Sequence, residues 1–218
     1  RHSLAGGCPE CGYAWPKLDS RHFSANSLGK CLECKGFGHI DAKTSGENND
    51  ANKELTLCDF CEGIGLSYDL KAIKIQGQSV LDCHKATIYE LRGWCQKLMD
   101  HAVAESPAFQ RVLQELLAQL DRLIKVGLTY LTISRRVRYL SGGEAQRLKL
   151  SGVLGENLRG ILYVLDEPSQ GLHPIEVMNL VSVLRELRDA GNTIIVADHD
   201  EVIIKNADWV IDLGPKGG

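Results

Sequence analysis

The chain has 218 residues, of which 44% are apolar, and its formal net charge is −3. This nearly neutral charge argues against a nucleic-acid-binding surface that extends over the whole chain. No apolar run approaches the length of a membrane span, and the first residues do not form a signal peptide. The length and composition predict one large core with a smaller module beside it.

The sequence pattern predicts three regions. Region 1–68 is expected to be a cysteine-rich zinc-binding module, because residues 1–40 contain many turn residues and too few apolar ones to form a core. A polar, asparagine-rich loop is expected at 43–53. Region 69–139 is expected to be a strand hairpin and a helical subdomain, and region 140–218 an α/β part.

In region 69–139, a strand is expected at 70–75, turning at 76–78 into Ser79, Val80 and Leu81. A helix is expected from Thr87 to Met99, and a longer one from Ser106 to Gly127. The apolar face of the first consists of Ile88, Leu91, Cys95 and Leu98. That of the second consists of Val112, Leu113, Leu116, Leu117, Leu120, Leu123 and Ile124.

Region 140–218 alternates helices with strands, which predicts an α/β layer with a largely parallel sheet. The expected elements are a helix at 142–153, a strand at 161–165, a helix at 175–190, a strand at 193–197, a short helix at 200–206 and a strand at 208–213.

Six of the eight cysteines form three Cys-x-x-Cys pairs, which favour zinc over disulfides. A structural zinc ion takes four thiolates. Spacing favours one site made of the first two pairs, which leaves the third pair to find partners elsewhere. The pairs are Cys8 with Cys11, Cys31 with Cys34, and Cys58 with Cys61. Cys83 and Cys95 stand alone and are expected to be ordinary thiols.

Two neighbouring motifs suggest nucleotide chemistry. Ser141, Gly142 and Gly143 open a helix whose free N–H groups and positive dipole end suit a phosphate, although Ser141 and Glu144 also form a plain capping box. The basic residues of this helix, including Arg147 and Lys149, are interpreted as a solvated face.

The apolar run 161–165 leads directly into Asp166 and Glu167. A buried strand of this kind delivers an aspartate to Mg²⁺ and a glutamate to the attacking water. His199 follows a second apolar strand, where a histidine can contact a phosphate or simply lie on the surface. Together the motifs are similar to the signature and Walker B elements of ABC-type ATPases.

The 218 residues contain no Gly-x-x-x-x-Gly-Lys-Ser/Thr loop to hold the β- and γ-phosphates. Gly29 and Lys30 do not form one, because Cys31 follows them and the earlier glycine is missing. We therefore expect the chain to be incomplete as an ATPase by itself. The expectation is that it is a fragment, the C-terminal part of one ATPase half.

Several segments resemble the UvrA family, the damage-recognition subunits of the bacterial nucleotide-excision-repair excinuclease. They are Ser141–Arg147, Asp166–His173, Ala207–Pro215, Cys8–Gly12, Arg21–Asn26 and Cys31–Cys34. Tyr130–Arg135 resembles the first of the two ATPase halves of UvrA better than the second. The resemblance implies an α/β fold, with a partial ABC-type ATPase core, a helical signature segment and a zinc module.

The resemblance also implies roles for single residues. Glu167 and His199 would be catalytic. Nucleotide contacts would come from Ser141, Gly142, Gly143, Glu144, Gln146, Asp166, Ser169 and Gly171, the last two lying in the loop that crosses between ATPase halves. An alternative zinc grouping follows as well, because Cys31, Cys34, Cys58 and Cys61 resemble the two pairs that share a zinc beside the signature of UvrA.

The implied cofactors are ATP, Mg²⁺ and Zn²⁺. The implied partners are damaged double-stranded DNA, the second ATPase half, a second copy of the full-length protein and the excinuclease subunit UvrB, in the cytoplasm and without a membrane. Two alternatives stay open: a UvrA-like resistance protein that sequesters DNA-binding drugs, and a non-catalytic interaction fragment. The basic and aromatic residues of the first module can face DNA or only solvent. These are Arg1, His2, Tyr13, Trp15, Lys17, Arg21 and His22.

Overall fold

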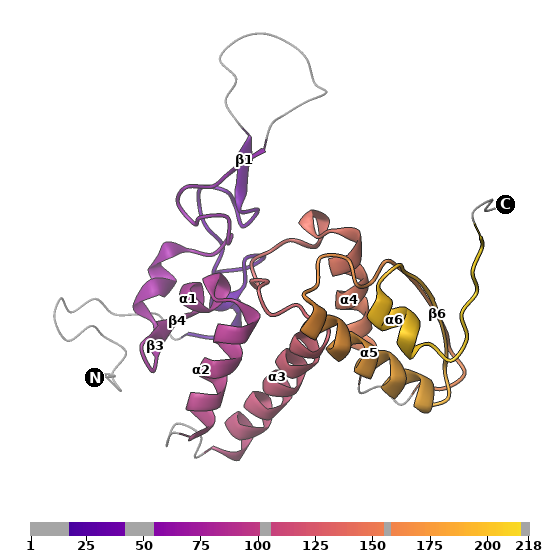
Figure 1. Ribbon diagram of the computed structural model, residues 1–218. Coiled ribbons are helices and arrows are strands. Elements are labelled where there is room, and N and C mark those ends of the chain that lie inside the picture. Colours follow the sequence, from indigo (N-terminus) through magenta and orange to yellow (C-terminus); the bar gives the residue numbers. More distant parts are fainter. Residues whose placement is uncertain (1–17, 42–54, 101–105, 155–157, 215–218) are drawn as a thin grey trace, which may run out of the picture. The chain divides into compact units, whose positions relative to one another are not determined.

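The computed structural model describes residues 18–41, 55–100, 106–154 and 158–214 (Figure 1). The chain divides into two compact units, Arg1–Lys85 and Ala86–Gly218. Among the described helices, none has both the length and the apolar character needed to cross a lipid bilayer. The loop expected at 43–53, and Cys8 and Cys11 of the first pair, lie outside the described residues.

The first unit is built from short elements and two small antiparallel sheets. Leu66, Leu70 and Leu81 form its apolar core. In chain order its elements are the 3-10 helix η1 (Ser20–Phe23), β1 (His39–Asp41), β2 (Leu55–Leu57), the 3-10 helix η2 (Tyr68–Ala72), β3 (Lys74–Ile75), β4 (Gln78–Ser79) and α1 (Val80–Lys85).

The strand expected at 70–75 is only partly correct. Residues 68–72 form η2 instead, because the Ser67 hydroxyl accepts a hydrogen bond from the Asp69 N–H at 3.4 Å and Leu70 turns into the core. Only β3 is extended, and it pairs with β4. The predicted turn is confirmed, since Gln76 and Gly77 both have positive φ angles, of 48° and 81°, as a tight hairpin requires.

The second unit begins with two helices, α2 (Ile88–Asp100) and α3 (Pro107–Lys125), which lie side by side (Figure 1). The face predicted for α2 is confirmed. In α3, Leu113 and Leu120 of the predicted face are buried, but Val112 is largely exposed. The buried residues of α2 are Ile88, Leu91, Cys95 and Leu98.

The α/β part follows a short 3-10 helix, η4 (Val137–Tyr139), and from 142 to 206 its elements agree with the predicted ones to within one residue. Strands β5 and β6 pair in parallel, with Leu162 opposite Thr193 and Asp166 opposite Ala197. Helix α5 packs against β6 and α6. The elements are α4 (Gly142–Val153), β5 (Leu162–Asp166), α5 (Pro174–Asp189), β6 (Thr193–Ala197) and α6 (Glu201–Asn206).

The strand predicted at 208–213 is wrong. The segment has no regular secondary structure, and Trp209 and Ile211 are 91% and 86% exposed. A strand exists only through hydrogen bonds to a neighbouring strand. Within the described part of the chain, this sheet consists of β5 and β6 alone, and 208–213 pairs with neither.

Candidate functional site

Four buried cysteine side chains meet in the first unit, and their sulfur atoms all lie within 4.8 Å of one another. The Sγ atoms of Cys31 and Cys58 are 4.0 Å apart, and those of Cys34 and Cys61 are 3.6 Å apart. A tetrahedral zinc ion with Zn–S bonds of about 2.3 Å places its sulfurs about 3.8 Å apart. The cluster therefore has the donor set and the dimensions of a four-cysteine zinc site.

The two cysteine loops are built in the same way. The Gly38 N–H donates to the Cys34 sulfur at 3.1 Å, and the Gly65 N–H donates to the Cys61 sulfur at 3.2 Å. Both glycines have positive φ angles, 68° and 83°, which let the backbone turn its N–H toward the sulfur. Such hydrogen bonds stabilise thiolates, the form in which cysteine binds a metal.

Backbone hydrogen bonds also join the two loops to each other. The Cys31 N–H donates to the Gly65 carbonyl at 2.8 Å, and the Cys58 N–H donates to the Gly38 carbonyl at 3.0 Å. The first residue of each cysteine loop is therefore hydrogen-bonded to the last residue of the other loop. This reciprocal pairing holds the four sulfurs in one place.

The protonation behaviour of the thiols also suits a metal. Burial raises the pKa of Cys31, and it raises the pKa of Cys61 to about 12. Burial acts in the same direction on Cys34, but hydrogen bonds from Gly38 and Cys61 outweigh it and leave the pKa of Cys34 below its ordinary value. Four buried thiolates repel one another, so the four sulfurs ionise together only when a bound cation compensates their charge.

Among the described residues, Cys31 and Cys34 meet Cys58 and Cys61, which supports the alternative zinc grouping. The antiparallel pairing of β1 with β2 explains this arrangement, because it places His39 opposite Leu57 and so returns the third pair beside the second. The cost of closing a loop rises slowly with its length, so the longer separation between these pairs is a small penalty.

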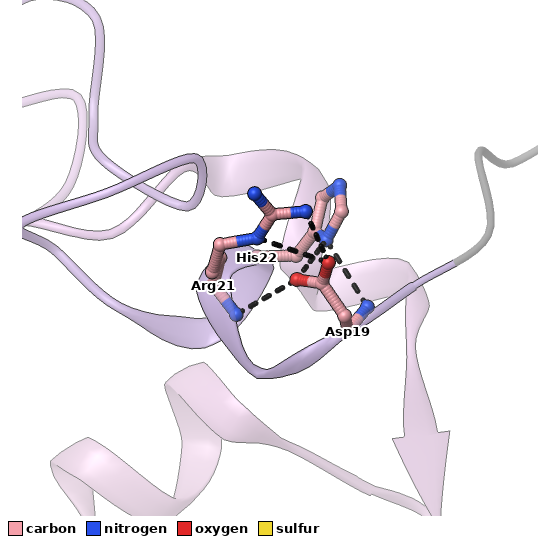
Figure 2. Close-up of polar contacts among 3 residues, drawn as sticks. All are labelled: Asp19, Arg21 and His22. Carbon is pink, nitrogen blue, oxygen red and sulfur yellow. Dashed lines mark hydrogen bonds and ion pairs between the residues drawn. The ribbon is translucent and has the colours of Figure 1, made fainter.

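Of the basic residues that can face DNA, the structure describes only Arg21 and His22, and both are engaged by Asp19 (Figure 2). The Asp19 carboxylate accepts from the Arg21 guanidinium at 2.7 Å, and the His22 Nδ1 lies 3.1 Å from the same carboxylate. This arrangement lowers the pKa of Asp19 to about 2, chiefly through Arg21. The local role of these residues is to cap η1.

In the second unit, the start of α4 is held by a closed set of hydrogen bonds. The Ser141 hydroxyl accepts from the Glu144 N–H at 3.2 Å, and the Glu144 carboxylate accepts from the Ser141 N–H at 2.7 Å. The Tyr130 hydroxyl donates to the other Glu144 oxygen at 2.7 Å. The predicted capping box is confirmed, and both Glu144 oxygens are used inside the protein, on a side chain that is nearly buried.

The two candidate carboxylates lie at the end of β5. The Asp166 side chain is exposed, and its N–H donates to the Gln146 side chain of α4 at 3.2 Å. Glu167 has a φ of 45°, a strained value for a residue with a side chain. Its N–H donates to the Ala197 carbonyl of β6 at 2.7 Å, and its carboxylate lies 4.0 Å from Nδ1 of His199. The parallel strands thus bring Glu167 and His199 together.

The sequence pattern suggested that Arg147 lies on a solvated face, but the structure buries it. Its side chain is only 1% exposed, and its guanidinium donates to the carbonyls of Pro168 and Gln170, at 3.0 Å and 3.1 Å. The loop that follows Glu167 is therefore fastened to α4. Lys149, by contrast, is exposed as predicted. A helical pattern alone does not reveal a buried arginine, because its partners are carbonyl groups elsewhere in the chain.

The loop also bonds to β6 through Asp198, a residue that sequence analysis did not place in the site. The Asp198 carboxylate accepts from the Ser169 hydroxyl at 2.7 Å and from the Ser169 N–H at 3.1 Å. Burial favours a higher pKa for Asp198, but these and other hydrogen bonds bring it below the ordinary value. Gly171 has a φ of 77° and ends this turn.

The start of α4 lies beside the ends of β5 and β6, and we call the residues Ser141–Gly143, Asp166, Glu167 and His199 the edge. A Cβ added to Gly143 would lie 3.6 Å from the Glu167 carbonyl, whereas one added to Gly142 would meet nothing within 4 Å. A cavity of about 590 Å³ opens beside Ser141. Its other lining residues include Tyr130, Arg135, Arg138, Tyr139 and Gln170.

This combination of a Ser-Gly-Gly helix start, two carboxylates ending a strand and a histidine ending its parallel neighbour is typical of part of an ABC-type ATPase fold. Comparison with models of known protein families gave no match. The chain is 37% identical over 189 residues to the UvrABC system protein A of Thermus thermophilus, a match that covers 84% of the chain and 19% of that protein. The chain belongs to the UvrA family.

Two further relatives agree with this assignment. Over 187 residues the chain is 41% identical to the UvrABC system protein A of Malacoplasma penetrans, covering 86% of the chain and 20% of the relative. Its fold is similar to the crystal structure of UvrA2 from Deinococcus radiodurans, with a TM-score of 0.69 and 33% identity over 92% of the chain and 23% of that protein. The chain thus spans about a fifth of the length of these relatives.

Proposed function

We propose that the chain forms the signature and Walker B part of an ATPase that recognises damaged DNA in nucleotide excision repair. The observation that carries the proposal is the edge on which Glu167 and His199, 4.0 Å apart, lie beside the Ser141 helix start. Family membership supports the repair role, and the exposed Ser141 and Gly142 at the start of α4 support a contact with a nucleotide phosphate.

Within this proposal, Asp166 holds Mg²⁺ and Glu167 orients the attacking water, while His199 contacts the terminal phosphate. Bound Mg²⁺ supplies positive charge that offsets the charge of the phosphates. Ser141 and Gly142 face a nucleotide that is held mainly by a second ATPase half. The positive end of the α4 dipole then stabilises the phosphates of this nucleotide. The phosphate-binding loop comes from outside these 218 residues.

We further propose a structural zinc ion on Cys31, Cys34, Cys58 and Cys61, which ties the two cysteine loops together. The proposed partners of the complete protein are damaged double-stranded DNA, a second copy and UvrB. In the part of the first unit that the structure describes, Arg21 and His22 are committed to Asp19, so the proposal assigns them no contact with DNA.

Gly142→Asp tests the nucleotide role of the signature helix. A side chain at this exposed position meets nothing within 4 Å, and an aspartate at a helix N-terminus is favourable for folding. We therefore expect unchanged or slightly higher stability, but at least ~10-fold slower ATP turnover by the intact ATPase, because two negative charges approach each other. Thermal unfolding and steady-state hydrolysis measure the two effects.

The matched control for Gly142→Asp is Gly142→Asn, which adds a side chain of the same shape without charge. Turnover by the asparagine variant should stay well above that of the aspartate variant. Equal, near-normal turnover by both variants would show that no phosphate approaches this helix.

The 218-residue chain alone is expected to hydrolyse ATP at no more than a background rate. Mg²⁺ and a base do not position a phosphate that no loop holds. Phosphate release by the purified chain, compared with its Glu167→Gln variant, measures this. Robust turnover that depends on Glu167 would contradict the expectation.

A further inference from the structure

The loop Pro168–Gly171 is held from two sides by side chains that the proposed chemistry does not use. On one side, the buried Arg147 of α4 donates to the Pro168 and Gln170 carbonyls. On the other side, Ser169 donates its hydroxyl and its N–H to Asp198. The loop begins directly after Glu167, so both attachments act on the position of that carboxylate.

Asp198 also holds the segment that carries His199. One of its carboxylate oxygens accepts from the N–H groups of His199 and Asp200, at 2.8 Å and 3.0 Å. With the two bonds from Ser169, this carboxylate accepts four hydrogen bonds. Hydrogen bonds to an ionised carboxylate are stronger than those between neutral groups, so this junction is well fixed.

We propose that Asp198 is a positioning residue that sets the geometry of Glu167 relative to His199. Its carboxylate joins the loop after Glu167 to the backbone of His199, and Arg147 fixes the same loop to the signature helix. Both attachments thereby hold the residue that acts on water beside the residue that acts on the terminal phosphate. The inference rests on the proposed ATPase function, and it names the residue that aligns Glu167 and His199.

The test is Asp198→Asn in the intact ATPase, with Asp200→Asn as the matched control. An asparagine keeps one acceptor oxygen but loses the charge and the second acceptor, so it cannot receive all four hydrogen bonds. Asp200 accepts from Val202 and Ile203 to cap α6, a role that asparagine performs equally well. We expect kcat to fall by about 10- to 100-fold in Asp198→Asn, with KM for ATP nearly unchanged, and no change in Asp200→Asn.

Ser169 separates positioning from a general loss of structure. Ser169→Ala removes the hydroxyl that donates to Asp198, whereas Ser169→Thr keeps it. The threonine variant should recover most of the kcat lost in the alanine variant. Equal loss in both variants would overturn the proposed hydrogen-bonded link.

Amide hydrogen exchange on the 218-residue chain tests the link without any nucleotide. Asp198→Asn should accelerate exchange at Ser169, His199 and Asp200, and Asp200→Asn should not. If the wild-type intact protein hydrolyses ATP and Asp198→Asn has an equal kcat, only the positioning role is overturned. If the wild-type intact protein hydrolyses no ATP, the proposed function fails and the inference fails with it.

Discussion

Cys58→Ser is expected to abolish tight zinc binding by the chain and to unfold the two cysteine loops. Cys58 is only 1% exposed, and its Sγ is one of the four in the cluster. A structural zinc site supplies about 10–16 kcal/mol of binding free energy, and removing one of its four thiolates weakens both the binding and the folding that depends on it. Metal analysis of the purified variant and amide exchange at 31–38 and 58–65 measure the two effects.

Cys83→Ser is the matched control, because Cys83 is a half-buried thiol outside the cluster. This variant should keep a full complement of zinc. Helices α2 to α6 should stay folded in the Cys58→Ser variant, since they belong to the other compact unit. If Cys58→Ser keeps its zinc while Cys8→Ser loses it, the grouping favoured by spacing is correct and the observed cluster is not the zinc site.

The elements of the α/β part were predictable because their causes are local. The capping box of Ser141 and Glu144 starts α4 at the expected residue, and Pro174 starts α5. Apolar runs that end in polar residues located β5 and β6. In each case the residues that determine the boundary lie within a few positions of it.

The zinc grouping could not be read from spacing, because it depends on the pairing of β1 with β2 across a long separation. The same limitation explains the failed strand at 208–213, whose exposed apolar residues lack a neighbouring strand among the described residues. A periodic pattern states which face of a segment is apolar, but not what covers it.

Sequence motifs named the exposed candidate groups at the strand ends, but not the side chains that hold their segments in place. Asp166, Glu167 and His199 follow from motifs, because the groups that act on a substrate are fixed by its chemistry. Arg147 and Asp198 have no such signature. Their partners are mostly backbone groups, which any sequence can provide, so only the folded chain shows what they hold.

Glu167→Gln in the intact ATPase is expected to lower kcat by about 10²- to 10⁴-fold while leaving ATP binding nearly unchanged. The amide is close in size to the carboxylate, so the strained backbone at φ 45° and the N–H bond to Ala197 can persist. The variant loses only the charge that orients and deprotonates water, an interaction needed in the transition state and not for binding. Single-turnover hydrolysis and equilibrium ATP titration separate the two.

Glu186→Gln is the control for Glu167→Gln, because it removes a carboxylate from an exposed ion pair with Lys125, away from the strand ends. It should leave both kcat and ATP affinity at wild-type values. If Glu167→Gln weakened binding as much as turnover, the carboxylate would have to act on bound nucleotide or on the fold itself. The 4.0 Å approach of Glu167 to His199 would then be a structural contact, and water activation would have to come from another group on the edge.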